Sequence, residues 1–505
     1  MNLIELFQPH FVERADEPAI YFDDQMYTYG QLDQRSDAVA ATLHGKYGLE
    51  KGDRAAMYLG NCLELVIFYL ACMKLGAIVV PMNLLYRDQE LNHLFTDAEP
   101  KVLLADPIRF EVFQPLRDKF SSVAHVFLTG PSRNQDRVIA FGQLTEINGS
   151  ARPGVQVTGD DAFLMIYTSG TTGRSKGAVL THHNLASNIV ALLHCWQWTH
   201  LDRFVLALPL FHVHGLCNGL HGALASGCQT HLRPRFKAPE VMQLLNEKSG
   251  TLFFGVPTMY ERLLEAAETG EQVPRGMRLY VSGSAPLSPD TFARFRQVFG
   301  HEILERYGMS ETVMITSNLY AGPRGQGTVG KPLPGVTVRV ITDEGSLVVE
   351  PGATGEIQVK GPNVLNEYWR QPDKTAESFI NGWFKTGDLG QWDEHGRLII
   401  CGRSKELIIS SGFNVYPQEL NNCMCDHPAI AEAAVIGVPD QLRGELVKAY
   451  VVRTDDSLTD EAVIGHCRKH LASFKVPRRV VFIDCLPRNA MGKIQLQQLP
   501  ERDRL

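Results

Sequence analysis

The sequence IYTSGTTGRSKGA, residues 166–178, joins a strand-like apolar lead to a loop rich in glycine, serine and threonine. Glycine lets the backbone approach a ligand closely and adopt positive φ, and successive N–H groups in such a loop can hold an anion. Hydroxyl groups add donors, and a lysine adds a mobile positive charge suited to phosphate. A phosphate-binding loop is therefore predicted, with ligands from Thr168, Ser169, Gly170, Thr171, Thr172, Gly173 and Lys176.

This loop differs from the Walker loop, which has four residues between its glycine and a Gly-Lys-Ser/Thr ending. Here Lys176 follows Gly170 by six positions and stands between Ser175 and Gly177. A polar surface turn is the alternative interpretation. It is disfavoured because the loop follows a strand and carries a second cation, Arg174.

The bulk composition excludes several classes of protein. A chain of 505 residues is too long for one core and predicts two to four domains. With 44% hydrophobic and 21% charged residues it is typical of a soluble globular protein, and a formal net charge of −7 argues against a general nucleic-acid or anionic-membrane binder. The apolar stretch 65–82 contains Lys74, so a buried helix running into a strand is expected there rather than a membrane span.

Cysteine usage and the N-terminus indicate the compartment. The ten cysteines show no framework spacing, and residues 1–19 mix apolar and charged side chains without the core of a secretory signal. Both features predict a cytoplasmic protein with free thiols.

Helix-like and strand-like segments alternate along most of the chain, which predicts an α/β fold with layered, largely parallel sheets. After about residue 330 short β-rich pieces separated by Gly/Pro turns predict a small β-rich subdomain, and after residue 402 a compact α/β segment follows. The expected strands are 54–58, 77–80, 102–105, 163–167, 205–208, 252–255 and 278–281 in the first part, then 336–341, 355–359, 433–437 and 448–452.

Seven further motifs follow the loop in order: PLFHVHG (209–215), SGSAP (282–286), ERYGMSET (305–312), TGD (386–388), GRSKE (402–406), SGFNVYP (411–417) and PRNAMGK (487–493). Over the whole chain they closely resemble the acyl-adenylate-forming, AMP-binding superfamily of acyl-CoA synthetases, peptide-synthetase adenylation domains and luciferases. The acyl-pocket motifs look most like the malonyl-CoA synthetase branch. The resemblance implies an N-terminal domain over residues 1–403, with the β-rich subdomain at about 330–402, and a mobile C-terminal lid over 404–505.

The implied activity is an ATP- and Mg²⁺-dependent acid–thiol ligation. A carboxylate attacks the α-phosphorus of ATP, giving an acyl-adenylate and pyrophosphate, and the acyl group then passes to coenzyme A. Such a step needs groups that neutralise many like charges. The resemblance assigns the catalytic residues as Lys493, Glu311, Thr168 and Lys176.

The nucleotide contacts are also assigned by resemblance. Glu311 aligns with the Mg²⁺-binding carboxylate, Asp388 with the ribose acceptor, and Arg403 with a second ribose or phosphate contact. Lys493 aligns with the lysine that stabilises the adenylation transition state. The remaining ATP and AMP contacts are expected from Ser284, Ala285, Pro286, Glu305, Arg306, Tyr307, Gly308 and Thr312.

The acyl and CoA sites are implied in the same way. The acyl pocket is expected to contain His212, Arg278, Ser282 and Met309, while a zinc pair at His212 and His214 is disfavoured because no carboxylate or cysteine lies close by in sequence. Lys405 aligns with the hinge, and the CoA side of the lid with Ser411, Gly412 and Phe413.

The substrate stays open at this point. Malonate or methylmalonate is the leading interpretation, and medium- or long-chain fatty acids and aryl acids are the alternatives. The acceptor is expected to be coenzyme A, with a carrier-protein thiol as the enzymatic alternative. A nucleotide-binding regulator without catalysis is the alternative from another class; retention of Lys176, Glu311, Asp388 and Lys493 speaks against it.

Overall fold

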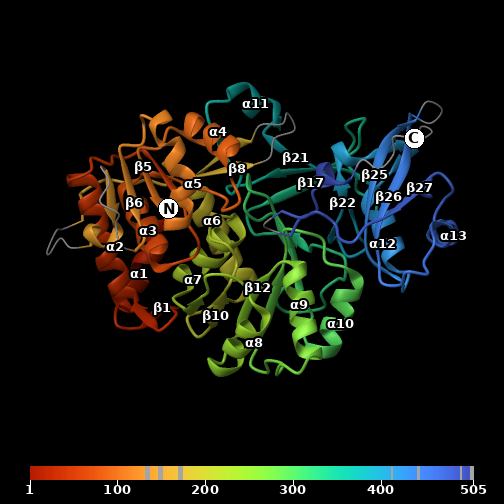
Figure 1. Cartoon of the computed structure of the whole chain (residues 1–505), viewed down its shortest axis with the longest axis horizontal. Coiled ribbons are helices and arrows are strands. Elements are labelled where there is room, and N and C mark those ends of the chain that lie inside the picture. Colours follow the sequence, from red (N-terminus) through yellow and green to blue (C-terminus); the bar gives the residue numbers. More distant parts are fainter. Residues whose placement is uncertain are drawn as a thin grey trace.

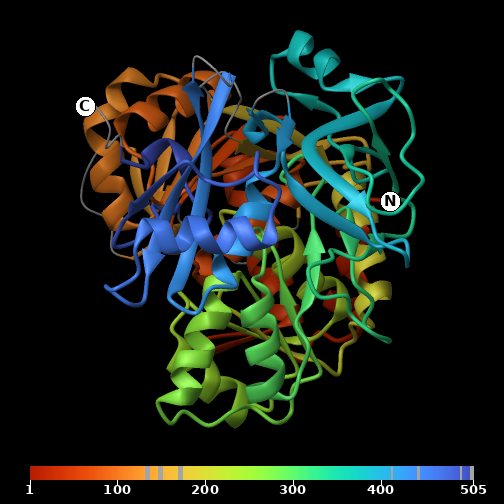
Figure 2. The ribbon, with the colours of Figure 1, turned by 90° about the vertical axis from the view of Figure 1, so that its right-hand side faces the viewer.

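A computed structural model describes residues 1–130, 137–145, 152–168, 175–410, 413–440, 444–489 and 492–500. The fold is mixed α/β, as predicted, with a large N-terminal domain and a small C-terminal domain. Figure 1 shows the C-terminal domain, in blue, at one end of the molecule beside β17 (Thr337–Ile341), β21 (Trp383–Trp392) and β22 (Leu398–Arg403). Figure 2 turns this domain toward the viewer and shows helices of the N-terminal domain beneath it.

The first large sheet has eight strands and is parallel in its centre, with two antiparallel strands at the edge nearest the β-rich part. In spatial order the strands are β19 (Glu367–Tyr368), β9 (Lys176–Thr181), β8 (Ala162–Thr168), β4 (Ile78–Pro81), β3 (Arg54–Tyr58), β5 (Val102–Ala105), β6 (His125–Leu128) and β7 (Val138–Ala140).

The second large sheet has nine strands, again parallel in its centre and antiparallel at both edges. Its order is β16 (Lys331–Pro332), β15 (Thr316–Ser317), β14 (Leu304–Tyr307), β13 (Leu279–Ser282), β12 (Leu252–Gly255), β10 (Arg203–Leu206), β11 (Gln229–Leu232), β1 (Pro18–Phe22) and β2 (Gln25–Thr28).

Two smaller sheets follow in the chain. An antiparallel sheet contains β17, β18 (Gly355–Lys360), β21, β20 (Phe379–Ile380) and β22. The sheet of the C-terminal domain contains β24 (Phe413–Val415), β23 (Ile408–Ser410), β26 (Gly444–Arg453), β25 (Ile430–Asp440) and β27 (Arg479–Phe482). The first of these two sheets falls in the part of the chain after about residue 330 for which the Gly/Pro turns predict a small β-rich subdomain.

Helices cover both large sheets in layers. Apolar side chains of α1 (Leu3–Glu13), α2 (Tyr29–Gly45), α3 (Leu63–Leu75), α6 (His182–Trp196) and α7 (His221–Ser226) share one core with the inner faces of both sheets. The outer face of the eight-stranded sheet packs on α4 (Asp88–Ala98) and α5 (Pro107–Phe113). The outer face of the nine-stranded sheet packs on α8 (Ala238–Glu247), α9 (Pro257–Glu268) and α10 (Pro289–Phe299). Further helices are the π-helix η3 (His214–Leu220), α11 (Pro372–Glu377), α12 (Pro417–Cys425) and α13 (Asp460–His470), together with short 3₁₀ turns.

The apolar stretch 65–82 forms the centre of this layered core. It contains most of α3, which is apolar on nearly all sides and therefore buried, and it continues into the fully buried β4. Lys74 is completely buried, and its ammonium donates to the carboxylates of Asp33 (2.6 Å) and Asp37 (2.7 Å). This pairing explains how a lysine is accommodated there. No helix among the described residues has the length and apolar character needed to cross a bilayer.

A buried histidine at the start of α6 makes the fold sensitive to acid. His182 is fully buried, its ring stacks on Phe163, and neither ring nitrogen has a hydrogen-bond partner among the described residues. Burial lowers the pKa of His182 to about 4. Because the folded state resists protonation while the unfolded state accepts it below about pH 6.5, stability is lost as pH falls from about 6.5 to about 4.

We therefore expect the substitution His182→Phe to reduce the loss of unfolding free energy between pH 7 and pH 4 by up to about 3 kcal/mol. Urea unfolding at several pH values measures this slope. The neighbouring His183, which is only half-buried, provides the control: His183→Phe should leave the slope unchanged. Equal slopes for the wild type and His182→Phe would contradict the prediction.

Candidate functional site

The described candidate residues gather where the carboxyl ends of strands from both large sheets meet the β-rich part and the C-terminal domain. Thr168 ends β8, Ser284 follows β13, and Tyr307 ends β14. Asp388 lies in β21 and pairs in register with Arg403 at the end of β22. Ligands of parallel α/β sheets bind at the carboxyl ends of the strands, so this junction is the expected place for a site.

Glu311 is the central carboxylate of this junction. It is buried, and its Oε1 accepts hydrogen bonds from the hydroxyl groups of Thr168 and Tyr368, each at 3.1 Å. Burial is the main cause that raises the pKa of Glu311. Tyr368 was not predicted from the sequence, because it lies in no motif and reaches the site only through the pairing of β19 with β9.

The surroundings of Glu311 fit a magnesium ion. Mg²⁺ is usually held by one or two carboxylates together with phosphate oxygens and water. Among the described residues no cationic side chain pairs with the Glu311 carboxylate, and the buried hydroxyl of nearby Thr312 has no hydrogen-bond partner. Glu311 would hold the ion, with Thr312 available as a further oxygen donor.

The loop that carries Glu311 is held in a strained conformation. Val313 is buried and has φ of 56°, in the left-handed region that a β-branched residue rarely adopts. The side-chain amide of Asn363 donates to the carbonyl oxygens on both sides of it, those of Thr312 (2.8 Å) and Met314 (2.9 Å). The Glu311 carbonyl accepts from the Leu365 N–H at 2.7 Å. The segment 363–368 therefore fixes the loop through three of its backbone carbonyls and, by the Tyr368 hydroxyl, through the Glu311 carboxylate.

A second carboxylate, Asp388, connects the two ends of the site. Its Oδ2 accepts the Tyr307 hydroxyl at 2.6 Å and its Oδ1 faces Arg403 Nε at 3.1 Å. Burial, with the Asp388 charge next, raises the pKa of Tyr307 well above its usual value, so the phenol stays protonated and donates. Two residues predicted from separate motifs, Tyr307 and Asp388, thus meet directly.

Lysines approach the junction from two sides. Lys176 begins β9, and its ammonium lies 4.9 Å from the centroid of the Tyr368 ring. Lys493 comes from the C-terminal domain; burial, followed by the positive charge of Arg403, lowers its pKa, while Asp388 raises it. The C-terminal domain therefore holds Lys493 within electrostatic reach of Asp388 and Arg403.

The remaining predicted site residues are placed only by the element or loop that contains them, or lie outside the described residues. Lys405 lies in a short 3₁₀ turn (Ser404–Glu406), and Phe413 begins β24. Gly308, Ala285, Pro286 and Met309 line the loops after β13 and β14. The predicted ligands outside the described residues are Ser169, Gly170, Thr171, Thr172, Gly173, Ser411 and Gly412.

A buried arginine dominates the region predicted as the acyl pocket. Arg306 lies in β14 with 5% of its surface exposed, and its Nε and Nη2 atoms have no hydrogen-bond partner within the described part of the chain. The guanidinium packs over Gly283, where a Cβ atom would stand 2.5 Å from Nε. Burial lowers the pKa of Arg306 to about 9, which leaves it cationic at neutral pH.

The groups around Arg306 are uncharged donors and acceptors. Burial first, and the charge of Arg306 second, lowers the pKa of His212 to about 4 and that of His214 further below its usual value. His214 Nδ1 is 3.2 Å from the hydroxyl of Ser284, a residue with φ of 72°. The buried Ser282 hydroxyl has no partner among the described residues. Arg306, expected from the sequence as a nucleotide contact, thus lies close to His212, an acyl-pocket candidate. Ser282 pairs in register with Glu305 and therefore faces away from Arg306.

Glu305, the neighbour of Arg306, faces the opposite side of β14. It is buried and accepts a hydrogen bond from the Gly327 N–H at 3.3 Å. Burial raises its pKa to about 8, so the carboxyl group is largely protonated at neutral pH. Its side chain contacts backbone groups in this structure.

The assignment of Arg278 to the acyl pocket is corrected by the structure. Arg278 precedes β13 and therefore lies at the amino end of the sheet, opposite to Ser282. Its guanidinium is bound by the Asp202 carboxylate at 2.6 and 2.7 Å and by two backbone carbonyls, and it stacks on Tyr320. These contacts leave it in a structural role.

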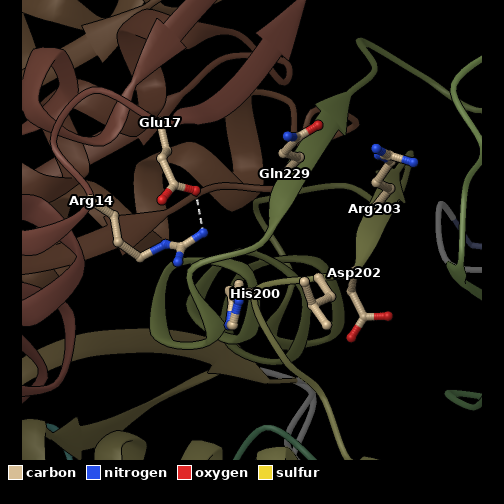
Figure 3. A pocket seen from close by; sticks show the side chains of 7 residues that line it. Arg14, Glu17, His200, Asp202, Arg203 and Gln229 are labelled. Carbon is tan, nitrogen blue, oxygen red and sulfur yellow. Dashed lines mark hydrogen bonds and ion pairs between the residues drawn. The ribbon is translucent and has the colours of Figure 1, made fainter.

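Asp202 also lines a separate surface pocket of about 290 Å³, which lies at the amino ends of β10 and β11. Figure 3 shows that the pocket is lined by charged and polar side chains, among which Arg14 pairs with Glu17. Its residues are Arg14, Glu17, His200, Leu201, Asp202, Arg203 and Gln229. Since none of them comes from the junction described above, this pocket is distinct from the candidate site.

The chain matches family models over most of its length. The model described as AMP-binding enzyme matches residues 7–369, and the model described as AMP-binding enzyme C-terminal domain matches residues 419–493. A malonate–CoA ligase of Arabidopsis thaliana is 34% identical over 99% of this chain and 88% of that relative. A long-chain-fatty-acid–CoA ligase of Yersinia pestis is also 34% identical, over 99% of this chain and 94% of that relative.

Solved structures of acyl-CoA ligases also match this chain. The crystal structure of ATP-bound MatB from Rhodopseudomonas palustris covers 98% of both chains with a TM-score of 0.88 and 39% identity. The apo crystal structure of the same protein gives a TM-score of 0.79. The overall arrangement of this chain is therefore more similar to that of the ATP-bound form.

The chain belongs to the AMP-binding enzyme family. It is an AMP-forming acyl-CoA ligase, an acid–thiol ligase that uses ATP, Mg²⁺ and coenzyme A.

The hydroxyl of Tyr368 provides a test of the Glu311 geometry. We expect Tyr368→Phe to raise the Mg²⁺ concentration needed for half-maximal activity about 10-fold, because the loss of a group that orients a metal ligand typically costs one to two orders of magnitude in affinity. Magnesium titration of pyrophosphate release measures the effect. Tyr58→Phe is the control. It also removes a tyrosine hydroxyl, but one that donates to the backbone carbonyl of Tyr86 at 2.7 Å and not to Glu311. An unchanged Mg²⁺ dependence for Tyr368→Phe would contradict the prediction.

Proposed function

We propose that this acyl-CoA ligase activates a small dicarboxylate, malonate or methylmalonate. The observation that carries the proposal is the Arg306 guanidinium, which is buried in the acyl region without a carboxylate partner among the described residues. A buried cation costs several kcal/mol unless an anion pairs with it. An acid with a second carboxylate would supply that anion.

The chemistry of the pocket favours a dicarboxylate over a fatty acid. A guanidinium binds a carboxylate through two parallel hydrogen bonds, and the unpartnered Nε and Nη2 atoms of Arg306 suit this geometry. The alkyl chain of a fatty acid would leave the charge unpaired in an apolar environment, which is costly. The neutral rings of His212 and His214 add polar contacts without a second positive charge.

The relatives alone do not choose between these acids. The malonate–CoA ligase and the long-chain-fatty-acid–CoA ligase are equally identical to this chain, at 34%. Arg306 supports the former, because an apolar tunnel for a long chain would have to pass a buried charge.

The proposed roles of the other residues follow from their positions. Glu311 holds Mg²⁺, which neutralises phosphate charge when bound, and Asp388 accepts the ribose hydroxyls. Lys176 and Lys493 place positive charge beside the phosphates from opposite sides. A single donor placed where charge develops in a transition state contributes about 3–4 kcal/mol.

The domain boundary is part of the proposal. Residues 404–505 act as a lid that turns about Lys405, so that Lys493 faces ATP in the first step and the segment around β24 faces CoA in the second. Hinges of this kind need only a few residues that absorb the change in backbone angles. Coenzyme A is the acceptor, as in the two relatives named above, which are CoA ligases. A cytoplasmic location is proposed on the sequence features alone.

Substrate choice is tested by pyrophosphate release with ATP, Mg²⁺ and CoA across malonate, methylmalonate, acetate, octanoate, palmitate and benzoate. Turnover confined to the two dicarboxylates is the expected result. A preference for octanoate, palmitate or benzoate would overturn the dicarboxylate proposal.

Replacement of Arg306 tests the residue itself. We expect Arg306→Met to lower kcat/KM for malonate by about 10²–10³-fold, since truncating one partner of a buried charge pair costs about 2–5 kcal/mol. The value for butyrate should change by less than about 3-fold. The melting temperature of the free variant should hold or rise, because a buried unpaired cation is removed.

Arg278→Lys is the matched control for this variant. Arg278 precedes the neighbouring strand β13 and pairs with Asp202 at the amino ends of the strands, away from Arg306. It should leave the ratio of kcat/KM for malonate to that for butyrate unchanged. An equal loss with both acids in Arg306→Met would contradict the proposed role of Arg306.

A further inference from the structure

The loop that carries Lys493 is a tight hairpin at the end of the C-terminal domain. Its arms are residues 487–489 and 492–495, and the Gln495 N–H donates to the Pro487 carbonyl at 2.8 Å. The Asn489 N–H donates to the Lys493 carbonyl at 2.9 Å, and Arg488 bridges to Ile494 as a strand pair. The backbone on both sides of Lys493 is thereby paired.

The peptide group between Gly492 and Lys493 is held at both of its polar ends. Its N–H, that of Lys493, donates to the side-chain oxygen of Asn489 at 3.0 Å. Its C=O, that of Gly492, accepts from Nη1 of Arg488 at 2.6 Å. Because Gly492 has φ of 73° and tolerates many conformations, these two side chains fix a peptide plane that would otherwise turn freely.

Arg488 is in turn held by the sheet of the C-terminal domain. Its Nη2 donates to Oε1 of Glu432, on β25, at 2.8 Å, and both side chains are about 70% buried, with 28% and 32% exposed. The Arg488 guanidinium thus connects the Gly492 carbonyl to strand β25 in the sheet of the C-terminal domain. A lysine could keep the charge, yet it lacks the planar fork that reaches two acceptors at fixed geometry.

The same guanidinium lies at the contact between the two domains. A Cβ atom on Gly492 would lie 3.1 Å from the Thr258 hydroxyl, so Gly492, the first residue of the second arm, packs against the first turn of α9. Glu261, one turn further along α9, is near enough to Glu432 and Arg488 for their charges to act on it. Burial, followed by the charge of Glu432, raises the pKa of Glu261, while Arg488 lowers it. Arg488 is therefore the cation near two carboxylates that come from different domains.

We propose that Arg488 is a positioning residue for the adenylation step, which acts by fixing the Gly492–Lys493 peptide against Glu432 so that the Lys493 ammonium points toward Asp388 and the nucleotide. The proposal rests on the proposed role of Lys493. It goes beyond that role by assigning the orientation of the lysine to a second residue, with Asn489 holding the other end of the same peptide.

This assignment predicts that the two half-reactions respond differently. Only adenylation needs Lys493 at the nucleotide, whereas thioester formation uses the other face of the C-terminal domain. Adenylation is measured by acid-dependent exchange of pyrophosphate into ATP, using the acid that the substrate panel selects. Thioester formation is measured separately with the synthetic acyl-adenylate of that acid and CoA.

For Arg488→Lys we expect the exchange rate to fall about 10- to 100-fold, since a displacement of about 1 Å of a catalytic group costs up to 10²-fold. The rate of thioester formation should stay within about 3-fold of the wild type. Asn489→Ala, which releases the other end of the peptide, should show the same split. Glu432→Gln should show a smaller one, because the amide oxygen still accepts the hydrogen bond.

Arg453→Lys is the matched control. Arg453 is also an arginine of the C-terminal domain paired with an acidic residue, Asp456, at 3.0 Å, but it contacts neither the hairpin nor α9 through its hydrogen bonds, ion pair or ring contact within the described part of the chain. The rates of both half-reactions in Arg453→Lys should stay within about 2-fold of the wild type.

The possible failures are distinguishable. Equal losses in both half-reactions for Arg488→Lys and Asn489→Ala would mean that these residues only maintain the fold of the domain, and would overturn the proposal; so would unchanged exchange. Lys493→Ala serves as the reference: unchanged exchange in that variant would overturn the proposed role of Lys493 itself.

Discussion

The burial of the Arg306 guanidinium is the constraint on which the rest of this site depends. A cation removed from water is tolerated only where the surrounding structure gives it no room to leave, and here the backbone at Gly283 packs directly against it. Burial, with the charge of Arg306 second, lowers the pKa of His212 and His214, so the pocket offers one full charge among uncharged groups. Glu311, on the loop that follows, is likewise buried with hydroxyl donors rather than a counter-charge. Within the described part of the chain, Arg306 and Glu311 are thus a cation and a carboxylate without a counter-charge, at neighbouring positions of the same strand–loop unit.

Much of this arrangement could be predicted from the sequence because the information is local. The alternation of strand-like and helix-like segments predicts the layered sheets. The composition of the loop around Thr168 and Lys176 predicts anion binding without any family resemblance. Tyr307 and Asp388 were each identified in a separate motif. That they share a hydrogen bond of 2.6 Å depends on how two sheets meet, which no single segment encodes. The described residues do not include most of the glycine-rich loop, so its proposed contacts with phosphate stay predictions.

The residues that sequence reasoning missed are those whose roles depend on strand direction or on distant pairing. Arg278 and Arg306 both border strands of the same parallel sheet, but one precedes its strand and the other lies within it near the carboxyl end. Since ligands bind at the carboxyl ends of parallel strands, the direction of β13 alone argues against Arg278. Asn363 and Tyr368 carried no comparable signal. They lie more than 50 residues from Glu311 and reach it through the short strand β19 and its approach to the loop.

The N-terminal and C-terminal domains support the cations Arg306 and Lys493 in different ways. Arg306 lies on β14 of the nine-stranded sheet and is held in place by the packing around it, since it is almost completely buried. Lys493 belongs to the C-terminal domain, and the neighbouring Gly492 packs closely against α9, where a Cβ atom would lie 3.1 Å from the Thr258 hydroxyl. That same glycine removes the backbone restraint on the lysine. The bonds from Arg488 and Asn489 to one peptide group offset this loss, and both side chains belong to the C-terminal domain itself.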